Sequence, residues 1–120
     1  MRCNVSSLRS RVGSSQPAFS ASYIAPGFTQ SQRVLFQCEG MGAEVVMGNQ
    51  VDGQLGTVCT VAFGAAYAAA SRSAGELSNF LDMSDDLLTE PVTITNGTLA
   101  VRDLPGLGVA IDFRALGEGR

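Results

Sequence analysis

The dipeptide Asn96-Gly97 lies between two segments, 92–95 and 98–101, in which apolar and polar side chains alternate. Asn and Gly tolerate the positive φ angles that a type I′ turn needs at both central positions, and this turn matches the twist of two antiparallel strands. The pattern therefore predicts a β-hairpin that turns at Asn96-Gly97. Any fold proposed for this chain has to include antiparallel pairing in its last third.

The middle of the chain has a different pattern, that of an α/β protein. Residues 44–47 form a short, mostly apolar run that is typical of a strand buried on both faces. A polar stretch with several glycines follows, and then an alanine-rich segment that predicts a helix over about 55–70. Strand, loop and helix in this order form a βα unit, and the loop after the strand is where such units carry function.

A second helix is predicted before this unit. Thr29 and Gln32 stand three residues apart, as in a capping box, and a narrow apolar stripe of Val34, Leu35 and Cys38 follows them. These features predict a helix over about 30–39.

Shorter elements are predicted elsewhere. Residues 18–25 suit a short strand that ends at a Pro-Gly pair. Ser73 and Glu76 again have the spacing of a capping box, which predicts a short helix after them. We expect a last extended segment over 109–112.

The composition excludes several kinds of chemistry. The chain has 120 residues with 45% hydrophobic content, enough for one domain with its own core. All eight basic residues are arginine and histidine is absent, so a Ser-His-Asp or Cys-His arrangement is excluded. The formal charge is −3, and the arginines are too dispersed for a phosphate-binding groove. We therefore expect no nucleic-acid partner.

The cysteines and the hydropathy pattern bear on cellular location. Cys3, Cys38 and Cys59 are odd in number and widely spaced, which favours reduced thiols over disulfides or a zinc site. Cys59 has no base to activate it, and we interpret it as a small core residue. No segment approaches the roughly 20 apolar residues of a membrane span. We expect a cytoplasmic protein with no membrane partner.

Four motifs follow one another in the last third of the chain: the sequence DDLLTEP at 85–91, the hairpin, the sequence PGLGV at 105–109, and Ile111-Asp112. This ordered set resembles the C-terminal signature of the muconate cycloisomerase and mandelate racemase branch of the enolase superfamily. Residues 44–57, which end in Leu55-Gly56-Thr57, resemble the eighth barrel strand of that family and the loop after it. The resemblance extends over about residues 28–112.

The resemblance implies a fold. The class is α/β: a C-terminal fragment of an enolase-type (β/α) barrel, with its last one or two βα units in residues 18–83. Residues 84–120 would form a C-terminal segment whose β-hairpin returns to the capping domain. Residues 1–17 are rich in Ser and Arg and poor in apolar side chains, so we expect a divergent, disordered tail there.

The resemblance also implies a function. Members of the family are metal-dependent isomerases or cycloisomerases that move a proton next to the carboxylate of a small substrate. They use a lysine base and a divalent metal, Mg or Mn, held by three carboxylates from the middle barrel strands. This chain has no lysine and no matching carboxylate trio, so we expect no cofactor in it and no activity from it alone. The motifs do not choose among cycloisomerase, racemase, dipeptide epimerase and o-succinylbenzoate synthase reactions.

The candidate site residues lie in the loop after residues 44–47. By resemblance, Asp52 matches an acid at the end of the last barrel strand, a proton donor or substrate contact; a solvated turn aspartate is the alternative. Asn49 and Gln50 are candidates for hydrogen bonds to a substrate carboxylate, or ordinary loop residues. Gly53 opens a helix whose free N–H groups favour an anion, although such starts are common.

Two further hypotheses remain from the sequence. Asp82, Asp85 and Asp86 lack the spacing of an EF-hand loop, and we interpret them as a solvated acidic connection rather than a metal site. The alternative to an enzyme part is a noncatalytic truncated remnant or an interaction module. Such a module would associate with itself or with a full-length relative through the open strand edges of 18–25 and 44–47.

Overall fold

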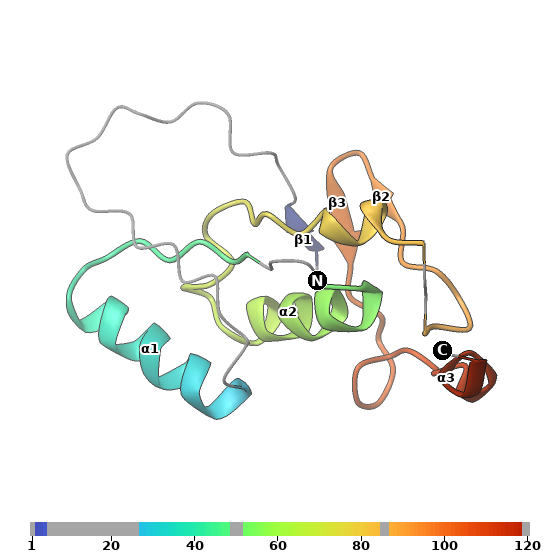
Figure 1. Ribbon diagram of the computed structural model, residues 1–120. Helices are drawn as coiled ribbons and strands as arrows, with labels where there is room; N and C mark the ends of the chain where they lie inside the picture. The colour runs from blue at the N-terminus through green and yellow to red at the C-terminus, as the bar shows by residue number, and fades with distance from the viewer. Residues whose placement is uncertain (1, 5–26, 49–51, 85–86, 119–120) are drawn as a thin grey trace.

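The computed structural model describes residues 2–4, 27–48, 52–84 and 87–118. Helix α2 lies between helix α1 and a small antiparallel sheet (Figure 1). The elements in chain order are β1 (Arg2–Asn4), α1 (Phe28–Gly40), α2 (Gln54–Ala66), the 3-10 helix η1 (Asn79–Asp82), β2 (Ile94–Thr95), β3 (Thr98–Ala100) and α3 (Phe113–Glu118).

The predicted hairpin is confirmed. β2 pairs antiparallel with β3, with Ile94 opposite Leu99 and Thr95 opposite Thr98. The turn between them has φ angles of 50° at Asn96 and 68° at Gly97, which is the left-handed region that the two residue types were expected to occupy. Leu99 turns its side chain into the core from this hairpin.

A third strand comes from the start of the chain. β1 pairs antiparallel with β3, with Arg2 opposite Ala100 and Asn4 opposite Thr98, so the sheet order is β1-β3-β2. The disorder expected over 1–17 therefore does not hold for residues 2–4. Strands pair through backbone N–H and C=O groups, and the edge of β3 offers these groups to a neighbouring strand. The composition of residues 1–17 therefore does not indicate that residues 2–4 pair with β3. The strand predicted at 18–25 lies outside the described residues.

Helix α1 is slightly longer than predicted, and its start is different. Gly27 is the N-cap and no side chain caps the helix, so the capping box at Thr29 and Gln32 is wrong. Ser31 instead donates a hydrogen bond from Oγ to the carbonyl of Gly27 at 3.0 Å. Leu35 is buried to 2% exposure, and it anchors the helix to the core.

Residues 44–47 do not form the strand that was predicted, although Val45 and Met47 are buried. A parallel strand buried on both faces needs partner strands on both sides. Gly48 instead forms a parallel bridge with Glu76, whose N–H donates to the carbonyl of Met47 at 2.9 Å. This bridge joins the segment before α2 to the segment after it, which is the pairing of a βαβ unit. The short helix predicted after Ser73 begins later in the chain, as the 3-10 helix η1.

Helix α2 ends at Ala66 and not at Ala70. Tyr67 has φ −124° and ψ 116°, which stops the helix. Its ring lies 4.7 Å from that of Phe63 and 6.0 Å from that of Phe36, between centroids. Tyr67 thus contacts Phe36 of α1 from outside the helix, whereas Phe63, inside α2, stacks on Phe28 of α1 at 6.2 Å.

Two groups of buried side chains hold these elements together, and α2 contributes to both. We call the first the α1 cluster; it joins α1 to the far end of α2 and consists of Leu35, Val45, Met47, Phe63, Ala69 and Ala70. We call the second the hairpin cluster; it joins α2 to the sheet and η1 and consists of Val61, Leu77, Phe80 and Leu99.

The last segment behaves partly as predicted. Ile111 forms an antiparallel bridge with Leu88, flanked by hydrogen bonds from Thr89 N–H to the Ala110 carbonyl (3.0 Å) and from Asp112 N–H to the Leu87 carbonyl (2.8 Å). Helix α3 then follows, which the sequence analysis missed.

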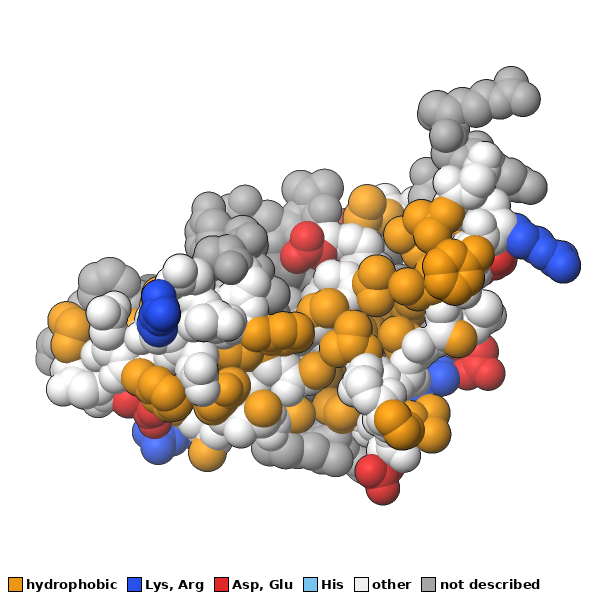
Figure 2. Space-filling model, turned by 90° about the horizontal axis from the view of Figure 1, so that it is seen from below, with side chains coloured by type: hydrophobic (Ala, Val, Ile, Leu, Met, Phe, Trp, Pro, Cys, Tyr) orange, Lys and Arg blue, Asp and Glu red, His pale blue; other side chains and the backbone are white. Residues whose placement is uncertain are grey.

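Phe113 at the start of α3 is 76% exposed, and apolar side chains form a nearly continuous band on the face seen in Figure 2.

Candidate functional site

The structure describes two of the four predicted site residues. Asp52 is exposed and directly precedes Gly53, which is the N-cap of α2 with φ −68° and ψ −177°. The carbonyl of Gly53 accepts a hydrogen bond from Thr57 N–H at 3.1 Å, which closes the first turn. Asn49 and Gln50 lie outside the described residues. Asp52 and Gly53 therefore stand together at the N-terminal end of a 13-residue helix.

The side chain of Asp52 lies against the first turn of α2. A Cβ atom added at Gly56 would stand 3.0 Å from Cβ of Asp52 and 3.1 Å from its Cγ. Contacts that short require one group to move, so glycine at position 56 provides the space for this carboxylate. The arrangement places a negative charge at the positive end of the helix dipole, where it is favourable.

The Asp52 carboxylate also affects Cys59, which lies further along α2. Burial raises the pKa of the Cys59 thiol, and the negative charge of Asp52 raises that pKa further. Cys59 is half-buried and, like Cys38, has a free thiol. A raised pKa keeps the thiol protonated at neutral pH, which disfavours a nucleophilic role.

The described part of the chain does not fit a divalent-metal site. No three His, Cys, Asp or Glu side chains in it lie close enough together to hold a metal ion. Asp82 is exposed at the end of η1, and Asp85 and Asp86 lie outside the described residues. The three carboxylates that the family resemblance calls for therefore have no counterpart in the described residues. Nor does any helix among the described residues have the length and hydrophobicity to cross a membrane.

Two contacts near this end of α2 had no sequence signal. Oε1 of Gln54 accepts a hydrogen bond from Val92 N–H, which ties the start of α2 to the segment before the hairpin. Nη1 of Arg102 lies 2.7 Å from Oε2 of Glu90, forming an ion pair at the surface. Both pairs join residues far apart in the sequence. The Gln54–Val92 bond depends on how the hairpin packs on α2, whereas the hairpin register brings the segments of Glu90 and Arg102 alongside each other.

Two features near the start of α2 bear on the fold. A carboxylate precedes a helix, and the segments on either side of the helix pair in parallel. In α/β proteins built of such units, functional residues gather in the loops at the carboxyl ends of parallel strands. The described residues thus combine helices with a small antiparallel sheet, and the candidate site residues Asp52 and Gly53 lie at the start of α2.

Comparison with known proteins identifies the family. Residues 23–115 match the family described as enolase C-terminal domain-like, and the chain belongs to this family. It is the C-terminal portion of a protein of the muconate cycloisomerase branch of the enolase superfamily. The resemblance inferred from the ordered motifs of the last third is thereby confirmed.

Two solved structures illustrate the similarity. A muconate lactonizing enzyme from Mycobacterium smegmatis has 57% sequence identity and a TM-score of 0.78, with 83% of this chain and 28% of that chain covered. A muconate lactonizing enzyme from Klebsiella pneumoniae has 25% identity and a TM-score of 0.70, with 78% of this chain and 26% of that chain covered. This chain thus spans little more than a quarter of either relative. A search of curated protein sequences gave no significant match.

Proposed function

We propose that the chain is the C-terminal part of a metal-dependent isomerase or cycloisomerase that acts on a small carboxylate substrate. The reaction would move a proton next to the carboxylate. The observation that carries the proposal is the 57% identity to the muconate lactonizing enzyme from M. smegmatis, which has also been solved in complex with muconolactone. The substrate of that enzyme is the model for the substrate here.

The proposal assigns α2 and residues 44–48 to the last one or two βα units of an enolase-type barrel. The parallel bridge between Gly48 and Glu76 supports this assignment, because barrel strands pair in parallel across each helix. The hairpin of residues 94–100 would return to the capping domain. The rest of the barrel, with its lysine base and metal-binding carboxylates, would come from outside this sequence.

Within this part, Asp52 is the proposed acid. It is exposed at the start of α2, so its carboxylate is open to a bound substrate, and Gly56 leaves room for it against the helix. A general acid has to sit on a rigid element within reach of the reacting carbon. Asn49, Gln50 and Gly53 are the proposed contacts of the substrate carboxylate, with the helix N–H groups as additional donors.

A chimera tests the proposal. The matching portion of the M. smegmatis enzyme is replaced by residues 28–112 of this chain, and formation of muconolactone is measured. We expect an active chimera in which Asp52→Asn lowers kcat by at least about 100-fold. Glu39→Gln on α1 is the matched control, since Glu39 is also exposed and lies outside the candidate site. A folded but inactive chimera would refute the function; an active chimera unaffected by Asp52→Asn would refute only the role of Asp52.

Magnesium or manganese belongs to the complete enzyme in this proposal. The chain alone has no lysine, and its described residues bring no carboxylate trio together. We expect isothermal titration of the isolated chain with magnesium to give no stoichiometric binding, and the isolated chain to be inactive. Micromolar binding of one ion would contradict this expectation.

The second candidate function is that of a noncatalytic remnant or an interaction module. Exposed large apolar side chains, among them Met41 and Phe113, favour it, because exposed apolar surface promotes association. Figure 2 shows apolar side chains gathered on one face of the molecule. The edges of β1 and β2 add unpaired backbone groups to such a surface. Size-exclusion chromatography distinguishes the two states: a concentration-dependent oligomer supports self-association, and a sharp monomer peak excludes it. A cytoplasmic location stays a prediction.

A further inference from the structure

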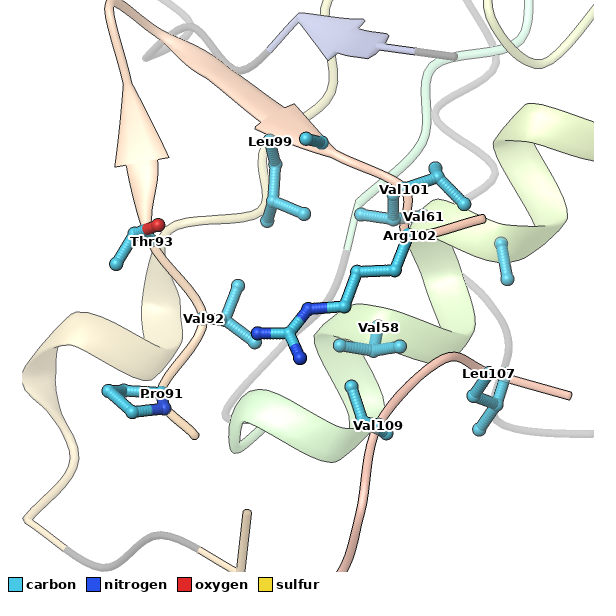
Figure 3. Close-up of a pocket in the computed structure, with 12 residues that line it drawn as sticks. Val58, Val61, Pro91, Val92, Thr93, Leu99, Val101, Arg102, Leu107 and Val109 are labelled. Carbon is cyan, nitrogen blue, oxygen red and sulfur yellow. The ribbon is translucent and has the colours of Figure 1, made fainter. Parts of the chain in front are cut away.

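A pocket of about 130 Å³ lies between α2 and the hairpin, apart from the residues of the candidate active site. Three segments form its walls, and Figure 3 shows their side chains around a common space. Val58 and Val61 belong to α2, and Val92 and Leu99 belong to the hairpin segment. Val109 belongs to the segment that follows the hairpin. Neither Asp52 nor Gly53 is among its lining residues.

The pocket has an apolar interior of a size that suits one small ring. A protein cavity of about 150 Å³ lined by aliphatic side chains stays dry and binds benzene. The hydrogen bond between Val92 N–H and Oε1 of Gln54 fixes the hairpin wall to the helix wall. The space is thus held open by backbone contacts as well as by packing.

Arg102 gives this pocket a charge. Its side chain runs from the hairpin across the space between Val92 and Val58 (Figure 3), and it lines the pocket together with the apolar side chains. Gly108 allows the chain to pass close to Arg102, because a Cβ atom at position 108 would stand only 2.9 Å from Cβ of Arg102. Gly108 has a φ of 68°, so larger residues are also disfavoured there by the backbone.

The partner of Arg102 is easily exchanged. Glu90 binds the guanidinium through one oxygen at 2.7 Å, but the two side chains are 42% and 69% exposed. Exposed ion pairs of this kind contribute little to stability. A guanidinium presents several donors in one plane and binds a carboxylate with two parallel hydrogen bonds, so a ligand carboxylate can replace or join Glu90.

We propose that this pocket binds a small monocarboxylic acid with a compact apolar body, its ring or alkyl group between α2 and the hairpin and its carboxylate on Arg102. The apolar walls select the body of the ligand and Arg102 selects its charge. An uncharged apolar molecule of the same size would lose the contact with the guanidinium, and a dicarboxylate would place a second charge among valine and leucine side chains, which is unfavourable.

Titration of the full chain with benzoate tests the proposal, with benzyl alcohol as the uncharged probe of matched size. Amide chemical shifts report where each compound binds. We expect saturable shifts in residues 58–62, 92–102 and 107–109, and benzoate to bind about tenfold more tightly than benzyl alcohol. Equal affinity for the two compounds, or no saturable shift with benzoate, would overturn the proposal.

Three variants separate the contribution of the Arg102 guanidinium from that of the apolar interior of the pocket. Arg102→Gln should abolish the preference for benzoate, whereas Glu90→Gln should increase benzoate affinity about threefold by freeing the guanidinium. Ala62→Leu fills the apolar part and should weaken both probes at least tenfold. Arg114→Gln, which removes an exposed arginine from α3, is the control and should change neither affinity. An unchanged benzoate preference in Arg102→Gln would also overturn the proposal.

Discussion

The α1 cluster and the hairpin cluster bury similar side chains but are supported differently. The hairpin cluster lies under a three-stranded ladder, and the bridge between Leu88 and Ile111 ties the following segment back to the chain. The α1 cluster is held mainly by side-chain packing and by the hydrogen bond from Nε2 of Gln32 to the Tyr67 hydroxyl, at 2.8 Å.

The difference shows which half of the molecule carries its own backbone partners. The ladder of the hairpin side is complete within the chain, because β2, β3 and β1 all belong to it. Residues 44–47 of the α1 side are buried like a barrel strand, yet they form no ladder in the described residues. Stability on the α1 side therefore depends mainly on apolar burial and a few hydrogen bonds, and we expect this side to open first.

The largest test of this comparison removes one leucine from each cluster. Leu77 is 0% exposed in the hairpin cluster and Leu35 is 2% exposed in the α1 cluster. Either change to alanine should lower the free energy of unfolding by about 2–5 kcal/mol. Leu77→Ala should also abolish hydrogen-exchange protection throughout the chain, whereas Leu35→Ala should release α1 and leave the hairpin amides protected. Simultaneous loss of both regions in Leu35→Ala would contradict the comparison.

The next largest effect on stability is expected when one glycine from each region is replaced by alanine. Gly97 has a φ of 68° in the hairpin turn, so Gly97→Ala forces a side chain into the left-handed region at a cost of about 1–2 kcal/mol. Gly40 ends α1 and a Cβ atom there would meet nothing within 4 Å. Gly40→Ala should change stability by no more than about 1 kcal/mol, in the stabilising direction. Urea denaturation measures both, and equal destabilisation would argue against the turn assignment.

The hydrogen bond between Gln32 and Tyr67 gives a smaller effect. Tyr67→Phe keeps the ring contacts with Phe36 and Phe63 and removes only the hydroxyl, so we expect a loss of about 0.5–1.5 kcal/mol. In a Gln32→Ala background the same change should be close to neutral. A loss of the same size in both backgrounds would mean that the hydroxyl acts through another contact.

The smallest effect depends on pH. The pKa of Cys59 is raised in the folded chain above the ordinary thiol value of 9.0, by burial first and by Asp52 second. The folded state holds this proton more tightly than the unfolded state, so the contribution to stability is complete below pH 9.0 and is lost as pH rises through the folded pKa. Between pH 8 and 10.5, wild type should lose stability more steeply than Cys59→Ala, with Asp52→Asn intermediate. Parallel pH profiles for all three would refute this.

The sequence predicted those features that depend on local chemistry. The turn at Asn96-Gly97 follows from the backbone preferences of two adjacent residues. The prediction of α1 follows from an apolar stripe, and that of α2 from an apolar, alanine-rich composition. The end of α2 was missed because Tyr67 leaves the helix to reach the rings of α1, a tertiary effect. Helix α3 was missed although Asp112 accepts a hydrogen bond from Arg114 N–H at 2.9 Å, a capping signal visible in hindsight.

The candidate site also has features that the sequence predicted and features that depend on tertiary contacts. Asp52 and Gly53 were predicted at the start of a helix, and the structure has them there. Gly56 was read only as part of a family motif, and its contact with Asp52 needed the folded first turn. Arg102 and the pocket it lines had no signal, because their three walls come from segments that meet only in the folded chain.

The position of β1 also constrains how the chain is made. Arg2 pairs with Ala100, so β1 leaves the ribosome long before its partner strand has been made. At roughly 5–20 residues per second, this delay is on the order of 5–20 s. During that time α1 and α2 can form without it, and the hairpin can close on its own short turn. β1 can therefore join the sheet only after β3 has been made.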